Sequence, residues 1–537
     1  MTRARLCFAW FAPALFVVVN LMTAALPARP AGAAVHFNRG NDAEPETLDP
    51  QRSSTLAEAH ILRDLFEGLL IQDRTGELAP GAAESWAVSP DALTYTFKLR
   101  HDGQWSNGDP VTAEDFVVAL RRLVDPSIGA EYANVIYPVR NAEAISAGTK
   151  PPETLGIAAP DHHTLIITLE TPTPYFLDLL AHQTTLPVHR ASLAAHGAAF
   201  AAPGKLVSNG AYVLAENLPG SHIRLTKNIR FHDAASISID VVDYILVKDL
   251  AAGVRRFRAG ELDFLPDVPS DQIKALRLAY GEQLMIAPLQ GTIYFGFDTT
   301  KPPYNDKRVR QALSIAIDRD VLADDIASGS IIAAARFVPP GTAGTATTTA
   351  NPSWQTLSII EREDRAKALL AEAGFTASRP LSVELRYNAS DNNKAMAVAV
   401  ADMWKQVGVT TRFVATDSRT HFAYLRDKGD YDVARAGWIA DYNDPQNFLF
   451  LLESGSGLNT TRWSFPPFDR LLQAARSERD ADRRFMLLRQ AEDMVLDEAP
   501  LTPIAHYTGR YLVSARLSGF IPNLRAANAT RFLQLAR

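Results

Sequence analysis

Strand and helix patterns alternate along almost the whole chain, and this alternation most restricts what the chain can fold into. Residues 93–100 read LTYTFKLR, with apolar side chains at every second position, as in a half-buried strand. Residues 112–126 repeat apolar side chains at helical spacing instead, between Thr112, which can cap a helix with Asp115, and Pro126, which ends it. Interspersed strands and helices of this kind predict an α/β fold.

Further segments repeat the two patterns. A second strand is expected at 165–170, which reads LIITLE and has Leu165, Ile167 and Leu169 at every second position. Helical spacing recurs over 309–317 and over 366–373, and Gly374 follows the latter as a helix end. We interpret the apolar stripes of these segments as core. The chain has 537 residues, and single cores stop growing near ~250–300 residues, so we expect two or three lobes.

The N-terminus is typical of a secretory signal peptide. Arg3 and Arg5 precede an apolar stretch from Leu6 to about Leu26, and small residues follow at 31–34. We expect cleavage after Ala33 or Ala34 and export of the mature chain. The alternative is an uncleaved anchor, because the apolar stretch approaches membrane-spanning length. Elsewhere the sequence contains no candidate spanning segment, so the exported chain is expected to be soluble.

Charge and cysteine content exclude several functions. Removal of the signal takes away three arginines and no acidic residue, so the mature chain is more acidic than the formal net charge of −6. This disfavours binding to nucleic acid. The chain's one cysteine, Cys7, lies within the signal, which leaves no thiol site in the mature part. No P-loop and no H-E-x-x-H motif occurs, and Ser456 lacks the spacing of a nucleophile elbow. We therefore expect no metal and no cofactor, and no motif indicates an enzyme.

One stretch carries an unusual pair of charges. Residues 431–445 read YDVARAGWIADYNDP, a strand pattern that contains Arg435 and is followed by a turn-rich segment that contains Asp441. Most such charges are solvated or paired within the protein, and Asp441 can equally start a turn. The alternative is that the two side chains hold opposite ends of a zwitterionic ligand.

Several stretches together resemble the periplasmic solute-binding proteins of peptide ABC transporters, solute-binding family 5, in their oligopeptide and murein-peptide branch. The matching stretches occur in family order and span essentially the whole mature chain. They are residues 44–70, 79–126 (with WSNGDPVTAEDF), 207–214, 304–320, 366–375 and 431–445 (with ARAGWIADYNDP).

This resemblance implies a three-lobed α/β clam shell of the periplasmic binding protein type II, with an accessory domain inserted into the first lobe. The ranges implied are 1–34 for the signal, 35–66, 192–293 and 509–537 for lobe I, 67–191 for lobe II and 294–508 for lobe III. The resemblance further implies a monomeric receptor that binds short peptides between two lobes and delivers them to a membrane permease.

The family's ligand contacts can be placed on this sequence. Asp441 matches the acid that pairs with the peptide α-ammonium, and Arg435 and Arg426 match arginines available to carboxylates. The remaining positions match strands that pair with the peptide backbone, or aromatic residues that line the cleft: Ala436, Gly437 and Trp438; Ser54, Thr55 and Leu56; Tyr132 and Tyr507.

The sequence also departs from the family. Asn393 stands where relatives carry a histidine that helps to hold some peptide C-termini, and Ile439 stands where relatives carry a disulfide cysteine. A neutral amide cannot supply a cation, so this anchor is expected to be weaker. Three alternatives remain: a narrower receptor for murein tripeptide, a secreted peptide hydrolase, and a scaffolding role.

Overall fold

The computed structural model describes Met1, residues 34–345 and residues 352–536. The chain divides into two units, Met1–Ala34 and Val35–Arg537. The predicted signal peptide lies, apart from Met1 and Ala34, outside the described residues. Within the described ranges, no helix is long and apolar enough to cross a membrane.

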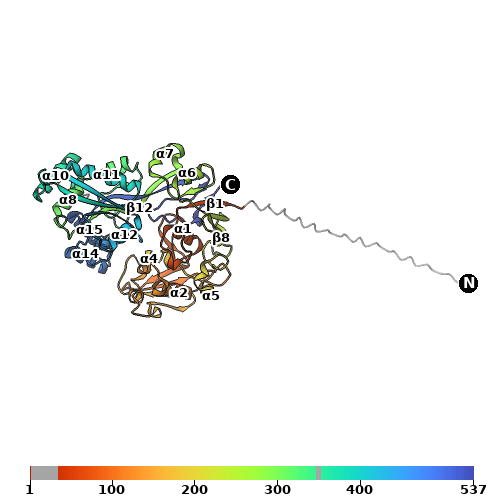
Figure 1. Ribbon diagram of the computed structural model, residues 1–537. Coiled ribbons are helices and arrows are strands. Elements are labelled where there is room, and N and C mark those ends of the chain that lie inside the picture. Colours follow the sequence, from red (N-terminus) through yellow and green to blue (C-terminus); the bar gives the residue numbers. More distant parts are fainter. Residues whose placement is uncertain (2–33, 346–351, 537) are drawn as a thin grey trace. The chain divides into compact units, whose positions relative to one another are not determined.

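A mixed sheet forms the centre of the unit Val35–Arg537 (Figure 1). Its order along the path is β15 (Val409–Thr416), β14 (Leu381–Asn388), β16 (Val433–Ile439), β12 (Leu284–Phe297), β17 (Leu501–Val513), β11 (Phe264–Leu265), β1 (His36–Asn41), β10 (Val241–Leu246), β9 (His222–Lys227) and β8 (Tyr212–Leu218). The short strand β13 (Ile332–Ala333) pairs with β17. The long antiparallel pair β12 and β17 therefore connects the β14–β16 part of the sheet to the β1 part.

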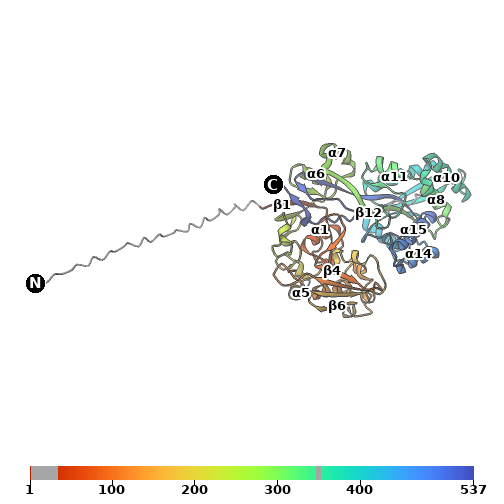
Figure 2. The ribbon, with the colours of Figure 1, turned by 180° about the vertical axis from the view of Figure 1, so that it is seen from behind.

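A second sheet is formed by residues 83–168. It is antiparallel, with the order β4 (Ala83–Val88), β5 (Thr94–Leu99), β7 (Thr164–Thr168), β6 (Ile157–Asp161). Figure 2 shows β4 and β6 grouped with α5 (Arg190–His196), away from the large sheet. Phe97 and Leu165 are register partners and fully buried, which confirms both predicted strands. The predicted cap of α2 (Ala113–Val124) is also present, because Asp115 accepts the Thr112 N–H at 2.9 Å.

Helices cover one face of the β14–β16 part. α8 (Lys307–Ile315), α10 (Ile359–Glu372) and α11 (Asp391–Gln406) pack around one apolar cluster with Val383 and Leu385 of β14. Trp404 of α11 is fully buried and donates its indole N–H to the carbonyl of Leu313 at 2.9 Å, so the polar atom of this large side chain is satisfied. Gly374 follows α10 with φ +87°, which confirms the predicted helix end.

Candidate ligand-binding site

The strand β16 presents an open edge. On one side it pairs with β12 along its whole length, from Val433 to Ile439. On the other side its described pairing with β14 covers two residues, Val433 and Ala434. Since β14 ends at Asn388, β16 has no strand partner on that side beyond Ala434 within the described part of the chain.

The alternation of the backbone shows which groups lie at this edge. Ala440 donates its N–H to Gln290, which immediately precedes the β12 residues paired with β16, at 2.7 Å. By strand alternation, the N–H and C=O groups of Gly437 and Ile439 then face away from β12. The Arg435 carbonyl faces the same side, where His421 Nε2 lies 2.8 Å from it. An extended ligand can therefore add to β16 beside Gly437 and Ile439.

Arg435 is a buried cation without an acidic partner. Its side chain lies in β16 and is 8% exposed. Its guanidinium donates to Tyr507 Oη at 3.1 Å and to Asn388 Oδ1 at 3.3 Å, while its Nε has no hydrogen-bond partner. Neutral partners compensate a buried charge only in part, so the site is favourable for an added anion.

Asn393 reaches Arg435 through one intermediate residue. Its side-chain amide donates to the Oδ1 of Asn388 at 3.1 Å, and this oxygen also accepts from Arg435. Asn393 is the third residue of α11 and its own N–H donates to the Ser390 cap. The structure thus places Asn393 beside the cationic end of the site, where its amide orients Asn388.

Asp441 lies just beyond the other end of β16. Its carboxylate makes no hydrogen bond or ion pair with any described residue. Its N–H donates to Asn447 Oδ1 at 3.3 Å, and its carbonyl accepts from Arg525 Nη2 at 2.9 Å. Burial raises the pKa of Asp441 to about 6, and the charge of Arg525 opposes this rise. A carboxylate without a cationic partner in such surroundings is suited to an ammonium group.

Aromatic side chains surround these two charges. Trp438 donates its indole N–H to Asn447 Oδ1 at 2.7 Å, so it shares this acceptor with the backbone of Asp441. Tyr132 stacks on His182 at 5.3 Å, and burial followed by the charge of Asp441 raises the pKa of Tyr132. Tyr507 lies across Gly437, where an added Cβ would come within 2.4 Å of its hydroxyl oxygen. The structure therefore gathers these aromatic residues around β16 and Asp441.

The predicted second pairing strand is wrong as secondary structure. Leu56 begins helix α1 (Leu56–Leu65), Thr55 is its N-cap with extended backbone, and Ser54 precedes the cap, so the three residues form no strand. The N–H groups of Ser54 and Thr55 both donate to the carboxylate of Glu58, at 2.8 and 2.9 Å. These two amides are thus used within the protein and cannot pair with a ligand unless the capping box opens.

Arg426 is the last residue of α12 (Ser418–Arg426) and its side chain is exposed. It makes no ion pair or hydrogen bond with the residues that the structure describes. Unlike Arg435, it is not held in place, and its role at the site stays a prediction.

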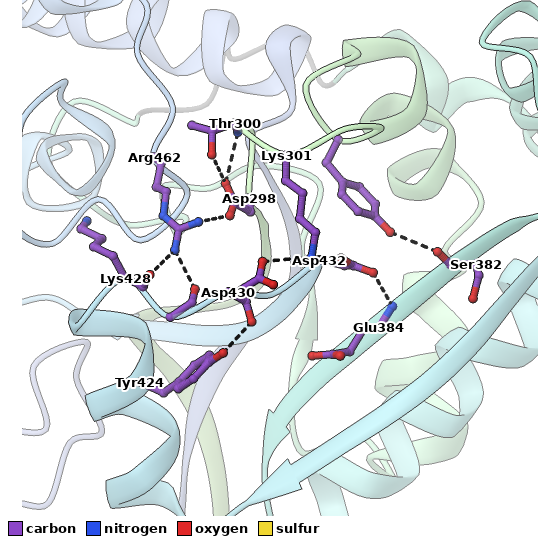
Figure 3. Close-up of polar contacts among 12 residues, drawn as sticks. Asp298, Thr300, Lys301, Ser382, Glu384, Tyr424, Lys428, Asp430, Asp432 and Arg462 are labelled. Atoms are coloured by element: carbon purple, nitrogen blue, oxygen red, sulfur yellow. Dashed lines mark hydrogen bonds and ion pairs between the residues drawn. The ribbon is translucent and has the colours of Figure 1, made fainter.

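A polar cluster at the start of β16 fixes the strand that carries Arg435 (Figure 3). Asp432 accepts the N–H of Glu384 at 2.9 Å and pairs with Lys301 at 2.8 Å, while buried Asp298 pairs with Arg462. Arg462 also donates to the carbonyl of Lys428 at 2.5 Å, in the loop after α12. The cluster therefore connects β16, β14 and two loops at the N-terminal end of β16.

Sequence reasoning missed three residues near the site. They are His421, Asn388 and Arg525, which contact Arg435 or Asp441 from segments distant in sequence. No local pattern marks them. Among the described residues no group of three or more His, Cys, Asp or Glu side chains is arranged to hold a metal ion.

Comparison with known proteins places the chain in a family. Residues 77–460 match the model described as "Bacterial extracellular solute-binding proteins, family 5 Middle". The periplasmic oligopeptide-binding protein OppA of Escherichia coli is 37% identical over 90% of this chain and 89% of its own. The probable deoxycholate-binding periplasmic protein YgiS of Escherichia coli is also 37% identical, over 90% of each chain.

Solved structures of similar proteins support the same family assignment. The Escherichia coli murein tripeptide-binding protein MppA has a TM-score of 0.80 at 35% identity, over 94% of this chain and 99% of its own. Haemophilus influenzae OppA in complex with the peptide RPPGFSPFR has a TM-score of 0.79 at 32% identity, over 94% and 99%. The fold is that of these proteins, and the chain belongs to the bacterial extracellular solute-binding proteins of family 5.

Proposed function

We propose that this protein is a periplasmic receptor that binds short peptides and delivers them to the membrane permease of a peptide ABC transporter. The proposal rests on one structural arrangement. The open edge of β16 lies between Arg435, a buried cation without an acid, and Asp441, a carboxylate without a base. A peptide supplies a backbone for the edge, an ammonium for Asp441 and a carboxylate for Arg435. Relatives named as oligopeptide- and murein-peptide-binding proteins support this assignment.

The spacing of the two charges fits a short extended ligand. Asp441 lies six positions after Arg435, which corresponds to roughly 20 Å in an extended strand. The long arginine side chain shortens the distance that a ligand must span. Main-chain hydrogen bonds to Gly437 and Ile439 are independent of side-chain identity, so we expect tolerance of many sequences.

The proposal divides the mature chain into three lobes with the ranges given above. The four-stranded sheet lies entirely within 67–191, the range of lobe II. The proposed hinge is the pair β12 and β17, which crosses both proposed boundaries of lobe III, at 293/294 and 508/509. The register of this pair shifts between Pro288 and Thr292, close to the first boundary.

Charge argues against one alternative ligand. A bile acid such as deoxycholate, named for the relative YgiS, carries one carboxylate and no ammonium. It would match Arg435 but leave Asp441 desolvated without a cation, which is unfavourable. The murein tripeptide alternative has both charged ends and stays compatible with the site. The proposal makes the chain a receptor rather than a hydrolase.

Titration calorimetry with tri-alanine tests the proposal. We expect binding by the wild type and a loss of affinity of ~10-fold or more in Asp441→Asn, because the ligand's ammonium would be left unpaired. Asp402→Asn is the matched control, since Asp402 is an exposed acid on α11, and it should bind like the wild type. Equal affinity in Asp441→Asn would refute the role of Asp441.

Ligand identity can be settled on the purified protein. Native mass spectrometry should find a mixture of peptides bound to the wild type. A single muropeptide would favour the murein alternative, and preferential binding of added deoxycholate would refute the peptide proposal. Cleavage of added tri-alanine on long incubation would support a hydrolase.

A further inference from the structure

The open edge of β16 is short, because contacts within the protein close it at both ends. At one end, the N–H of Asp441 donates to Asn447 Oδ1 at 3.3 Å, and the Asp441 carbonyl accepts from Arg525 Nη2 at 2.9 Å. At the other end, the carbonyl of Arg435 lies 2.8 Å from His421 Nε2. Main-chain pairing with a ligand is therefore limited to the residues between Arg435 and Asp441.

Two residues in this interval keep unpaired main-chain groups on the open side. The N–H and C=O groups of Gly437 and Ile439 face away from β12, and they make no hydrogen bond with any residue that the structure describes. The Ile439 side chain is 45% exposed, so the edge is accessible to solvent at this point. The open edge thus offers two donors and two acceptors to a ligand.

His421 closes the edge at Arg435 with a side chain from the helix α12. The imidazole is fully buried, and burial lowers its pKa, so it is neutral near pH 7. Because a carbonyl oxygen can only accept, the ring carries its single proton on Nε2 and donates it to Arg435. A ligand N–H that paired with this carbonyl would need the position that Nε2 occupies, since both groups approach the oxygen from the same side of β16.

These limits determine how far a peptide could pair with β16. A peptide whose ammonium lies at Asp441 would run antiparallel to β16, with its first residue opposite Ile439. Alternate residues of an antiparallel pair share hydrogen bonds, so the third ligand residue would pair with Gly437. The N–H of a fifth residue would require the carbonyl of Arg435. Because His421 already binds that carbonyl, main-chain pairing is complete at the third residue.

We propose that His421 determines the length of the peptides that the protein selects, because it ends the ligand strand after the third residue. The inference rests on the proposed function, since the register starts from a peptide ammonium at Asp441. A dipeptide lacks the residue that pairs with Gly437. A pentapeptide gains no further bond to β16, and ordering its added residues costs conformational entropy. Peptides of three or four residues are therefore preferred.

Calorimetry on the wild type with a series of alanine peptides tests this inference. Tri-alanine should bind about 10-fold more tightly than di-alanine, because it adds two main-chain hydrogen bonds to Gly437. Penta-alanine should bind no more tightly than tri-alanine. N-methylation of residue 3 of penta-alanine removes the N–H that pairs with Gly437 and should weaken binding about 10-fold, whereas N-methylation of residue 5 should leave the affinity within about twofold.

Two variants of His421 test its role directly. His421→Ala frees the Arg435 carbonyl, so penta-alanine should gain about 3- to 10-fold relative to tri-alanine, the size expected for one main-chain hydrogen bond. N-methylation of residue 5 should then remove this gain. His421→Gln keeps a side-chain N–H donor and should keep the preference of the wild type.

The matched control is His189→Ala. His189 is also a buried histidine that contacts an acceptor through Nε2, Asp109 Oδ2 at 2.9 Å, but it is the N-cap of α5 and not a neighbour of β16. This variant should keep the wild-type ratio of affinities for penta-alanine and tri-alanine.

Several outcomes would overturn the inference. They are tighter binding of penta-alanine than of tri-alanine by the wild type, equal weakening by N-methylation at residues 3 and 5, or an unchanged ratio of the two affinities in His421→Ala, which would show a structural role alone. If His421→Ala does not fold, the wild-type comparisons and His421→Gln still decide. Failure of the wild type to bind any of the alanine peptides would instead refute the proposed function itself.

Discussion

At the scale of the residue, the two charged side chains at the ends of β16, Arg435 and Asp441, have different surroundings. Arg435 is held by two neutral acceptors, Tyr507 and Asn388, so its direction is fixed while its charge stays uncompensated. Asp441 has no partner for its carboxylate, and burial raises its pKa to about 6. A cation is thus permanently present at one end, whereas the anion at the other end depends on pH.

This difference predicts how peptide affinity varies with pH. Asp441 must be ionised to bind an ammonium, and a peptide ammonium stays protonated below its pKa of about 7.7–8. Affinity for tri-alanine should therefore be nearly constant from pH 7.5 to 6.5 and fall as pH decreases through 6, approaching ~10-fold per pH unit below that value. Calorimetry at several pH values measures this.

The raised pKa of Asp441 has the opposite effect on the stability of the ligand-free protein, which should increase as the pH falls. Because the folded-state pKa lies above the ordinary value of 3.8, ionised Asp441 disfavours the folded state, and protonation relieves this as pH falls through 6. Asp441→Asn should thus raise the melting temperature of the free protein at pH 7.5 while weakening binding. A lower melting temperature, or affinity that is flat down to pH 5, would contradict the assignment.

At the scale of the element, β16 is positioned from its N-terminal end. Figure 3 shows the polar cluster of Asp298, Lys301, Asp432 and Arg462 at the start of the strand. The Asp298 side chain is 2% exposed, and it accepts the N–H and hydroxyl of Thr300 at 3.1 and 2.7 Å as well as pairing with Arg462. Removal of this buried carboxylate would leave Arg462 without its ion pair and both donors of Thr300 without their acceptor.

We therefore expect Asp298→Ala to lower the free energy of unfolding by ~2–4 kcal/mol, the usual cost of breaking a buried charge pair. The matched control is Arg476→Ala, which removes an arginine 45% exposed from its pair with Glu453 and should cost less than ~1 kcal/mol. Urea unfolding followed by tryptophan fluorescence measures both. Equal costs would show that the cluster does not stabilise the strand.

Local patterns explain which elements could be predicted from the sequence. The strands β5 and β7 and the helices α2, α8 and α10 have apolar side chains at regular spacing, and burial follows that spacing. The family resemblance predicts that Ser54–Leu56 is a strand that pairs with the ligand. The sequence T-L-A-E at 55–58 nevertheless contains the spacing of a capping box, in which Glu58 binds the Thr55 N–H, and this local signal outweighs the alignment.

The rest of the candidate site depends on contacts between distant segments. Arg525 reaches Asp441 across 84 positions, and Asn388 reaches Arg435 across 47. Neither contact leaves a periodic or spaced pattern in the sequence. The pairing of β16 with β14 at only two residues, which leaves the edge open, is equally a property of the assembled sheet.

At the scale of the whole molecule, the segment that carries Asp441 is held by residues 175–178 and by the C-terminal segment. Tyr442 stacks on Tyr175, with ring centroids 4.2 Å apart and planes at 9°. Arg525 bridges Asp178 and the Asp441 carbonyl. Tyr175 and Asp178 belong to the proposed lobe II, and Tyr442 to the proposed lobe III. These contacts couple the position of Asp441 to the arrangement of the lobes.

Removal of the stack should therefore affect binding through the residence time of the ligand. An aromatic pair of this kind contributes ~0.5–1.5 kcal/mol, so we expect Tyr175→Ala to speed peptide dissociation by roughly 2- to 10-fold with a smaller change in association. Stopped-flow fluorescence with a labelled peptide measures both rates. Hydrogen exchange should also rise at residues 439–447, because the segment loses one of its supports.

The matched control for this prediction is Phe465→Ala. Phe465 stacks on Trp463 with centroids 5.4 Å apart, but both rings lie within the proposed lobe III. Loss of this stack should lower the melting temperature without changing the dissociation rate. If Phe465→Ala speeds dissociation as much as Tyr175→Ala, the effect is one of general stability. The contact between Tyr175 and Tyr442 would then have no part in holding Asp441 against its ligand.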